Sequence, residues 1–385
     1  MRLPDRSCTL VTVTDNHRPA TRGTKPGPTV IDLFSGAGGM TLGFVEAGFE
    51  PIFAVEIDRD AAETYRANFD PDGNVADQPG DEAHVYACPI ERIESFPAAD
   101  VIIGGPPCQG FSPLGRDRDH KSRAELNELW RQYLRAIRQV HPKVFVIENV
   151  PEFLKSDQFA TFLDIFREDG TLAEYEIRFD VVKAVEYGVP QQRRRGIVIG
   201  SRIGEPKWPR KTHGPDAESR IPFVTVRDAI GDLPENPTDI DLHWGRNPTA
   251  KSIERYRAVP PGGNRFDLAR QRPDLLPNCW RNKATGTTDV FGRLWWNRPS
   301  LTIRTEFFKP EKGRYLHPTA DRPITHREAA RLQTFTDDFI FTGSKIQVAR
   351  QIGNAVPPTL ARAIAEAVLE TLMQEPIESH RAGLS

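Results

Sequence analysis

Short apolar runs alternate with helical stretches between residues 29 and 201, and this alternation constrains the fold more than any other feature of the sequence. The runs TVIDLF, PIFAVEI, DVIIGGP, KVFVIENV and GIVIGS are short, rich in β-branched residues and bounded by turn residues, which is typical of buried strands. Helical stretches lie between them at 40–48, 59–69, 124–140 and 158–168. The alternation predicts an α/β fold with a doubly wound, mostly parallel sheet covered on both faces.

A second region of different texture follows. Prolines crowd the residues from 202 to 299 and periodicity fades, so we interpret this stretch as a smaller irregular domain, which is expected because 385 residues are many for one core. Regularity then returns. Thr325 and Glu328 form a capping box that predicts a helix to about residue 335, and two prolines precede a predicted helix at about 359–375.

Composition excludes several classes of protein. Hydrophobic residues make up 38% and charged residues 27%, and no run of about 18 apolar residues predicts a membrane span. The cysteines (Cys8, Cys88, Cys108 and Cys279) are far apart, so we expect neither disulfides nor a zinc site, and a cytoplasmic location. The net charge is only −2, so a nucleic-acid-binding surface would have to be local. Residues 1–28 form a leader without the apolar core of a signal peptide, and 376–385 form a tail.

Glycines follow the first predicted strand directly, in the segment DLFSGAGGMTLG. Gly36, Gly38 and Gly39 permit a sharp turn and a close approach of the backbone to a ligand. A threonine replaces the last glycine of the dinucleotide fingerprint, which counts against NAD or FAD. Glu56, at the end of the next strand, is placed to bind the ribose hydroxyls of an adenosine moiety. The alternative is a tight turn without a ligand.

Cys108 lies in a loop that favours reactivity. In GGPPCQGFS it stands between Pro-Pro and Gln-Gly, at the carboxyl end of a strand, where ligands gather in such sheets. The alternative is an inert buried cysteine, the commoner use of this residue. Glu148 ends the apolar strand VFVIENV, where partial desolvation would favour its protonated form. A solvated or helix-capping acid is the alternative for Glu148.

Six motifs together resemble the ordered motif set of the DNA cytosine-5 methyltransferase family, of the bacterial restriction–modification type. They are DLFSGAGG, GGPPCQGFS, ENVPEFL, PQQRRR, REAARLQTF and QIGNAVP, and they occur in the family's order. The resemblance implies a catalytic and cofactor-binding domain at 29–201 and a target-recognition domain at 202–299. Residues 300–375 would contain the remainder of the recognition domain and a C-terminal return to the catalytic domain.

The resemblance also implies a reaction. A methyl group would pass from S-adenosyl-L-methionine to carbon 5 of a cytosine, after the Cys108 thiolate attacks carbon 6. Glu148 would protonate ring nitrogen 3. Arg195, with Arg193 near it, would hold the base and stabilise the activated ring. A base then removes the proton at carbon 5 and Cys108 leaves, and no metal is needed.

The cofactor pocket implied by the resemblance departs from the family at one point. Its expected members are Phe34, Ser35, Gly36, Ala37, Gly38, Gly39, Glu56, Ile57, Pro107, Asn354 and Val356, with Phe34 stacked on the adenine. The family's acid for the adenine amino group is missing, because Cys88 or Pro89 stands where an Asp is expected. We expect backbone groups, or an acid at another position, to take that role. Thr336, where the family commonly has Pro, should alter only a helix end.

Double-stranded DNA is the partner that the resemblance implies. The target base must swing out of the duplex, because its carbon 6 is unreachable in the stack. Residues 112–123 are polar and basic, which suits a loop that closes behind the base, although a plain solvated charge run is the alternative. The expected DNA contacts are Gln109, Ser112, Arg116, Arg118, Lys121 and Gln192. Arginines of the inserted domain are candidates for further contacts, whereas its tryptophans are expected in the core.

Three alternatives stay open beside this interpretation. One is a family member that acts on tRNA, and another is a non-catalytic DNA-binding relative, which the presence of Cys108, Glu148, Arg193 and Arg195 disfavours. The third is a small-molecule methyltransferase, which leaves the Pro-Pro-Cys loop unexplained. We expect a monomer, with a cognate restriction endonuclease as a possible partner.

Overall fold

A computed structural model describes residues 27–78, 83–107, 129–281 and 288–374. Cys108 and the predicted closing loop at 112–123 therefore lie outside the described residues. The same holds for five of the six expected DNA contacts, all except Gln192.

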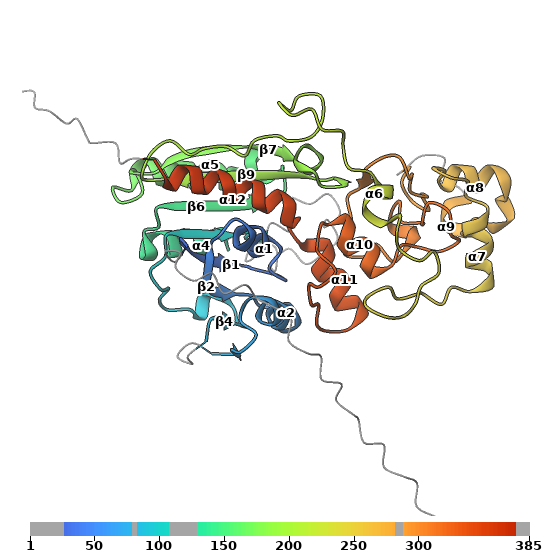
Figure 1. The fold of residues 1–385 in the computed structure, drawn as a ribbon, viewed down its shortest axis with the longest axis horizontal. Coiled ribbons are helices and arrows are strands. Elements are labelled where there is room, and N and C mark those ends of the chain that lie inside the picture. Colours follow the sequence, from blue (N-terminus) through green and yellow to red (C-terminus); the bar gives the residue numbers. More distant parts are fainter. Residues whose placement is uncertain (1–26, 79–82, 108–128, 282–287, 375–385) are drawn as a thin grey trace, which may run out of the picture.

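One large sheet organises the first part of the chain (Figure 1). Among the described residues, eight strands form it in the order β3-β4-β2-β1-β5-β6-β9-β7. Their bounds are β1 Thr29–Leu33, β2 Glu50–Val55, β3 Val75–Ala76, β4 Val85–Tyr86, β5 Val101–Gly104, β6 Val144–Asn149, β7 Glu176–Lys183 and β9 Arg194–Ser201. Only β9 runs antiparallel to its neighbours, β6 and β7. The predicted doubly wound, mostly parallel α/β fold is confirmed.

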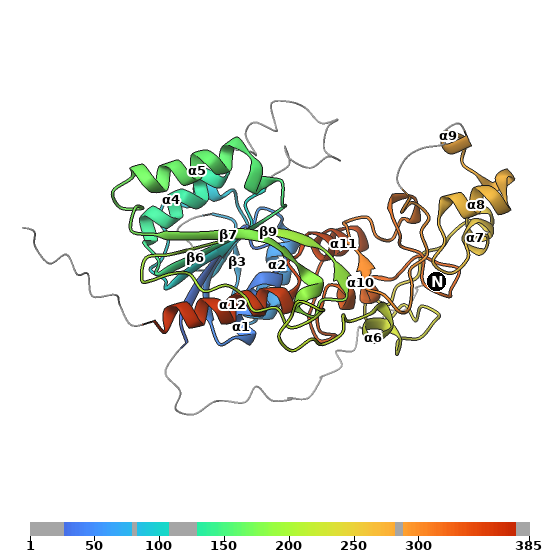
Figure 2. The same cartoon turned by 90° about the horizontal axis from the view of Figure 1, so that it is seen from above.

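Helices cover both faces of this sheet, as Figure 2 shows from above. Their bounds are α1 Gly39–Glu46, α2 Arg59–Phe69, α4 Trp130–Val140, α5 Asp157–Glu168 and α12 Pro358–Leu372. One apolar core joins α4 and α5 to the sheet, and a second joins α1 and α12 to the opposite face. The helices predicted at 40–48, 59–69, 158–168 and 359–375 are confirmed, with α1 ending two residues and α12 three residues earlier than expected. The helix predicted at 124–140 is confirmed from Trp130 onward, because its first five residues lie outside the described ranges.

A smaller unit with its own core lies beside the sheet domain (Figure 1). It contains α6 Val226–Ile230, α7 Ala250–Arg257, α8 Arg265–Gln271, α9 Asn278–Arg281, α10 His326–Leu332 and α11 Lys345–Asn354. Short 3₁₀ turns lie at η1 Ile90–Arg92, η3 Phe153–Lys155, η4 Ala184–Tyr187, η5 Pro273–Leu275 and η6 Pro310–Lys312. The largest apolar cluster of the smaller unit packs Val226 and Ile230 against Ile303, Phe335 and Ile352. Residues on both sides of position 299 therefore share one core. A parallel pair, β8 Gln191–Gln192 and β10 Ser300–Leu301, connects the two units.

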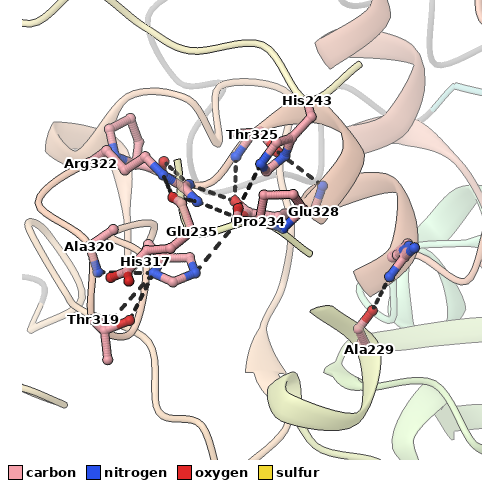
Figure 3. Close-up of polar contacts among 12 residues, drawn as sticks. Ala229, Pro234, Glu235, His243, His317, Thr319, Ala320, Arg322, Thr325 and Glu328 are labelled. Atoms are coloured by element: carbon pink, nitrogen blue, oxygen red, sulfur yellow. Dashed lines mark hydrogen bonds and ion pairs between the residues drawn. The ribbon is translucent and has the colours of Figure 1, made fainter. Parts of the chain in front are cut away.

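A buried charged cluster stabilises the start of α10 (Figure 3). The predicted capping box is confirmed, because the Thr325 side chain accepts from the backbone of Glu328 and the Glu328 side chain accepts from the backbone of Thr325. Both carboxylate oxygens of Glu328 also accept from the guanidinium of Arg322, at 2.7 and 2.9 Å. Burial would raise the pKa of Glu328, but the bonds and charge of Arg322 bring it below its usual value. The ion pair with Arg322 thus offsets the desolvation cost of the fully buried Glu328 carboxylate.

Candidate active site

A cavity of about 910 Å³ opens at the carboxyl ends of β1, β2, β5 and β6. In the sheet order, the chain continues from β1 to β2 on one side and from β5 to β6 on the other, so the order reverses between β1 and β5. Open α/β sheets bind their ligands at such a point. The predicted residues that line the cavity are Phe34, Ser35, Gly36, Ala37, Gly39, Glu56, Ile57, Pro107, Glu148, Arg193, Arg195, Asn354 and Val356. Two predicted residues are absent from this lining: Gly38 caps α1, and Gln192 is exposed on β8.

The turn after β1 adopts left-handed backbone at three places. Gly36 and Gly38 have φ angles of 54° and 86°, which glycine adopts at little cost. Phe34 also has a positive φ, of 61°, which is unfavourable for an aromatic residue and occurs mainly at functional sites. Gly39 serves a different purpose, because a Cβ there would lie 2.5 Å from the carbonyl oxygen of Val356. The absence of that side chain lets the C-terminal segment close the cavity.

Glu56 lies against this turn. One carboxylate oxygen accepts from the amide of Gly36 at 2.8 Å and the other from that of Asp58 at 2.9 Å. Burial raises the pKa of Glu56, and the two backbone hydrogen bonds oppose that rise. Beside it, Ile57 is 70% exposed, although it is a large apolar residue. Glu56 is thus fixed in orientation, and Ile57 offers an apolar surface to a ligand.

Glu148 and the residues before Cys108 form the inner wall. The Asn149 side chain donates to the carbonyl oxygen of Pro106 at 2.9 Å, which fixes the backbone leading to Cys108. Glu148 is 8% exposed, and Nε of Arg195 lies 2.5 Å from its Oε1. A Cβ on Gly105 would lie 3.3 Å from Oε2 of Glu148, so only glycine leaves this space open. Carboxylate, guanidinium and the Pro106–Pro107 backbone therefore converge on one wall.

Arg193 lines the same cavity but is almost completely buried. Its guanidinium donates to the carbonyl oxygens of Ile303, Gly353 and Asn354 at 3.2 to 3.4 Å. Burial lowers the pKa of Arg193, and the neighbouring charge of Arg195 adds to this effect. The side chain was predicted to hold the base together with Arg195. Its two terminal nitrogens instead donate to main-chain carbonyls, while its Nε has no hydrogen-bond partner among the described residues.

Sequence reasoning missed several residues that line the cavity. Asp32 is the second-last residue of β1, and its carboxyl accepts from the Thr41 hydroxyl at 2.6 Å. Burial raises the pKa of Asp32 to about 7. Glu91 lines the cavity next to Cys88 and Pro89, where the sequence lacks the expected acid. Arg350 lines it from α11, a helix that was not predicted. A signal existed for Asp32 and Glu91, since each is an acid at the end of a strand or within a few residues of it.

The arginines of the smaller unit that were candidates for DNA contacts mostly have partners within the chain. Arg257 pairs with Asp321, and Arg270 and Arg272 pair with acids of α8 and η5. Arg265 is 6% exposed, so it belongs to the interior of the unit rather than to a phosphate-binding surface. The tryptophans expected in the core are half-buried, and Arg314 lies 4.0 Å over the ring of Trp295.

The described residues contain neither a membrane-spanning helix nor a metal-binding cluster. None of their helices is long and apolar enough to cross a membrane. No group of three or more His, Cys, Asp and Glu side chains in these ranges is arranged to hold a metal ion.

Comparison with known proteins indicates one family of DNA methyltransferases. A family model described as C-5 cytosine-specific DNA methylase matches residues 28–370. The chain is 37% identical over 347 residues to the type II methyltransferase M1.HphI of Haemophilus parahaemolyticus, covering 89% of this chain and 87% of that protein. It is 33% identical over 350 residues to M.NgoFVII of Neisseria gonorrhoeae, covering 89% and 86%. A crystal structure of a putative DNA modification methyltransferase from an E. coli prophage superposes with a TM-score of 0.63 at 26% identity, covering 90% and 100%.

Proposed function

The chain belongs to the C-5 cytosine-specific DNA methylase family and is a DNA cytosine-5 methyltransferase of the type II restriction–modification kind, and from this we propose that it methylates a cytosine flipped out of duplex DNA through a covalent bond to Cys108. The observation that carries the proposal is the convergence of Glu148, Arg195 and the Pro106–Pro107 backbone on one wall of the cavity, opposite Glu56 and the glycine turn. A target base and a methyl donor would meet there.

The cavity suits S-adenosylmethionine in size and in lining. Its volume of about 910 Å³ falls within the range of ligand pockets. Glu56 has its carboxylate fixed at the end of β2, where ribose hydroxyls are bound in such sheets. Ile57 and Phe34 offer apolar surface for an adenine ring. When bound, this cofactor supplies an electrophilic methyl group on a positively charged sulfur.

Cys108 would begin the reaction at the other side of the base. Its thiolate sulfur forms a bond to carbon 6, and the electrons of the 5,6 double bond move into the ring. Glu148 supplies a proton to ring nitrogen 3, which neutralises the charge that develops there. Carbon 5 would then form a bond to the methyl group as the sulfur–methyl bond breaks, with S-adenosylhomocysteine as the leaving group. Loss of the carbon 5 proton to a base restores the double bond and expels the Cys108 thiolate.

Arg195 is the better candidate for the contact to the base. It faces the cavity beside Glu148, so its other donors can reach the carbonyl oxygen of a cytosine bound there. Arg193 is 1% exposed, and it donates to main-chain carbonyls. We therefore assign the base contact to Arg195.

Trapping on DNA that contains 5-fluorocytosine tests the covalent step. Fluorine cannot leave carbon 5 as a proton does, so a methylated adduct cannot release the enzyme. The expected result is a protein–DNA species that survives denaturation, forms only with S-adenosylmethionine and contains one methyl group. DNA binding without such an adduct would refute the covalent mechanism. A parallel assay with tRNA checks the substrate, and bisulfite sequencing of the methylated duplex gives the modified base and its context.

The relatives named as type II methyltransferases support two further proposals about partners. We propose a cognate endonuclease that cleaves the same sequence when it is unmethylated. Plasmid DNA methylated by this chain should resist a nuclease activity of the source cells that cuts unmethylated plasmid. We also propose that the protein acts as a monomer, for which light scattering should give a mass near 43.3 kDa.

A further inference from the structure

A buried polar network lies behind the cavity and joins three separate segments of the chain. Gln191, Arg193 and Gln333 form its side chains, and each is at most 1% exposed. The Gln191 side chain donates to Oε1 of Gln333 at 2.8 Å and accepts from the amide of Ile303 at 2.9 Å. The Gln333 side chain donates to the carbonyl oxygens of Ile352 and Ala355 at 2.5 and 3.4 Å.

Arg193 is the charged member of this network. It donates to Ile303 on one side and to Gly353 and Asn354 on the other. Between them, Arg193 and Gln333 therefore engage the carbonyls of all four residues from Ile352 to Ala355. These carbonyls belong to the end of α11, which an α-helix cannot satisfy internally.

The backbone segments in this network touch without intervening side chains. A Cβ on Gly353 would lie 2.3 Å from the amide nitrogen of Thr305, so only glycine fits there. Gly353, Asn354, Ala355 and Val356 all line the cavity. The part of the pocket wall formed by Gly353 to Val356 thus packs directly against the backbone of Ile303 to Thr305.

We propose that Arg193 is a positioning residue, which, with Gln191 and Gln333, holds the end of α11 in the shape that binds the cofactor. This inference rests on the proposed function, in which S-adenosylmethionine occupies the cavity. Without the guanidinium, the carbonyls of Ile303, Gly353 and Asn354 would lose donors in a buried place, and the turn would move to find others. Arg193 would then determine cofactor affinity, whereas Arg195 determines the chemistry on the base.

Calorimetric titration with S-adenosylmethionine and S-adenosylhomocysteine, joined to initial rates on duplex DNA, tests this division. Arg193→Met should raise the Kd of both compounds by about tenfold or more, because buried carbonyls lose their donors. Arg193→Lys should recover part of that loss, since one ammonium can still reach some of the carbonyls. The kcat at saturating cofactor should change much less than the Kd. Arg194→Met is the matched control, because Arg194 is the next residue in the chain, is exposed, and should leave the Kd unchanged.

Other outcomes would overturn the inference. An unchanged cofactor Kd with a reduced kcat in Arg193→Met would mean that Arg193 acts on the base itself. If Arg193→Met fails to fold, Arg193→Lys and Gly353→Ala decide, and wild-type cofactor affinity in both variants refutes the positioning role. A wild-type protein that binds neither compound would instead refute the proposed use of S-adenosylmethionine.

Discussion

Nε of Arg195 lies 2.5 Å from Oε1 of Glu148, yet among the described residues no group donates a hydrogen bond of good geometry to that oxygen. The guanidinium brings its charge close without aligning an N–H on the oxygen. A buried acceptor left in this state favours the arrival of a ligand group that can complete it. The exocyclic amino group of a bound cytosine could donate to this oxygen, while the Arg195 guanidinium donates to the carbonyl oxygen of the same base.

Glu148→Gln should slow methyl transfer by about 10²- to 10⁴-fold, the range of general acid catalysis, with DNA binding retained. Single-turnover rates and a filter-binding assay measure the two properties. Glu152→Gln is the control, because Glu152 is exposed nearby and should react at the wild-type rate. Combining Arg195→Met with Glu148→Gln should slow the reaction by less than the product of the two single effects, and strict multiplicativity would contradict a joint action on one base.

Cys108→Ala should abolish turnover and trapping on 5-fluorocytosine DNA, because no other atom in the proposal forms the bond to carbon 6. Cofactor affinity should stay within about twofold of wild type, since the residues assigned to the cofactor, Glu56 and the glycine turn, are unchanged. Calorimetry with S-adenosylhomocysteine measures this. Cys8→Ala, in the leader, should behave as wild type. Loss of cofactor binding in Cys108→Ala would refute the assigned role.

Glu91→Gln should weaken S-adenosylmethionine binding by about five- to tenfold, if Glu91 accepts from the adenine amino group. Glu91 is the carboxylate that lines the cavity beside Pro89. The variant should also discriminate less between adenine- and hypoxanthine-containing analogues of S-adenosylhomocysteine. Glu94→Gln, another exposed acid three residues away, is the matched control. Unchanged discrimination would leave backbone groups as the source of adenine specificity.

Asp32 should make the protein less stable as the pH rises through the acidic range. Its pKa is about 7 in the folded protein against a usual value of 3.8, chiefly because of burial. Between these values the folded state binds more protons, so its free energy of unfolding falls with rising pH, by up to about 1.4 kcal/mol per unit. Asp32→Asn should therefore gain stability relative to wild type from pH 4.5 to 7.5, in urea denaturation without cofactor. Asp164→Asn, on the surface of α5, should show no such trend.

His326 should act in the opposite direction. Burial lowers its pKa to about 4 from 6.5, with a ring nitrogen hydrogen-bonded to the carbonyl of Lys345. Between these values the unfolded state binds more protons, so stability is lost as the pH falls from 6.5 to 4. Removing this group by His326→Gln should flatten the acid limb of the stability curve by at most about 1.4 kcal/mol per pH unit. His84→Gln, at an exposed site, should leave the limb unchanged.

The central strands of the fold were predictable because they are buried on both faces. β5 and β6 are continuous apolar runs in the sequence, and both are completely buried. β7 escaped prediction because it is the last strand of the sheet order, and most of its side chains are exposed. α11 escaped for a different reason: its cap, Ser344, and its partner Gln347 form a capping box, but the helix lacks a strong apolar stripe.

The site was predictable where chemistry demands a particular residue, and less so where packing decides. Glu56 directly follows β2 and Glu148 lies at the end of β6. Parallel strands end at one edge of a sheet, so the convergence of the two residues follows from the order of the strands along the chain. The direction of the Arg193 side chain does not follow in this way. It depends on contacts with Ile303 and Gly353, which come from distant segments. The three consecutive arginines of the PQQRRR motif do not by themselves reveal which side chain is buried.

The contact between Gly39 and Val356 has a consequence for biosynthesis. The strands and the glycine turn leave the ribosome well before the segment that closes the cavity. Until Val356 has emerged, the nascent chain has only part of the wall of the proposed cofactor pocket, and we expect it not to bind the cofactor.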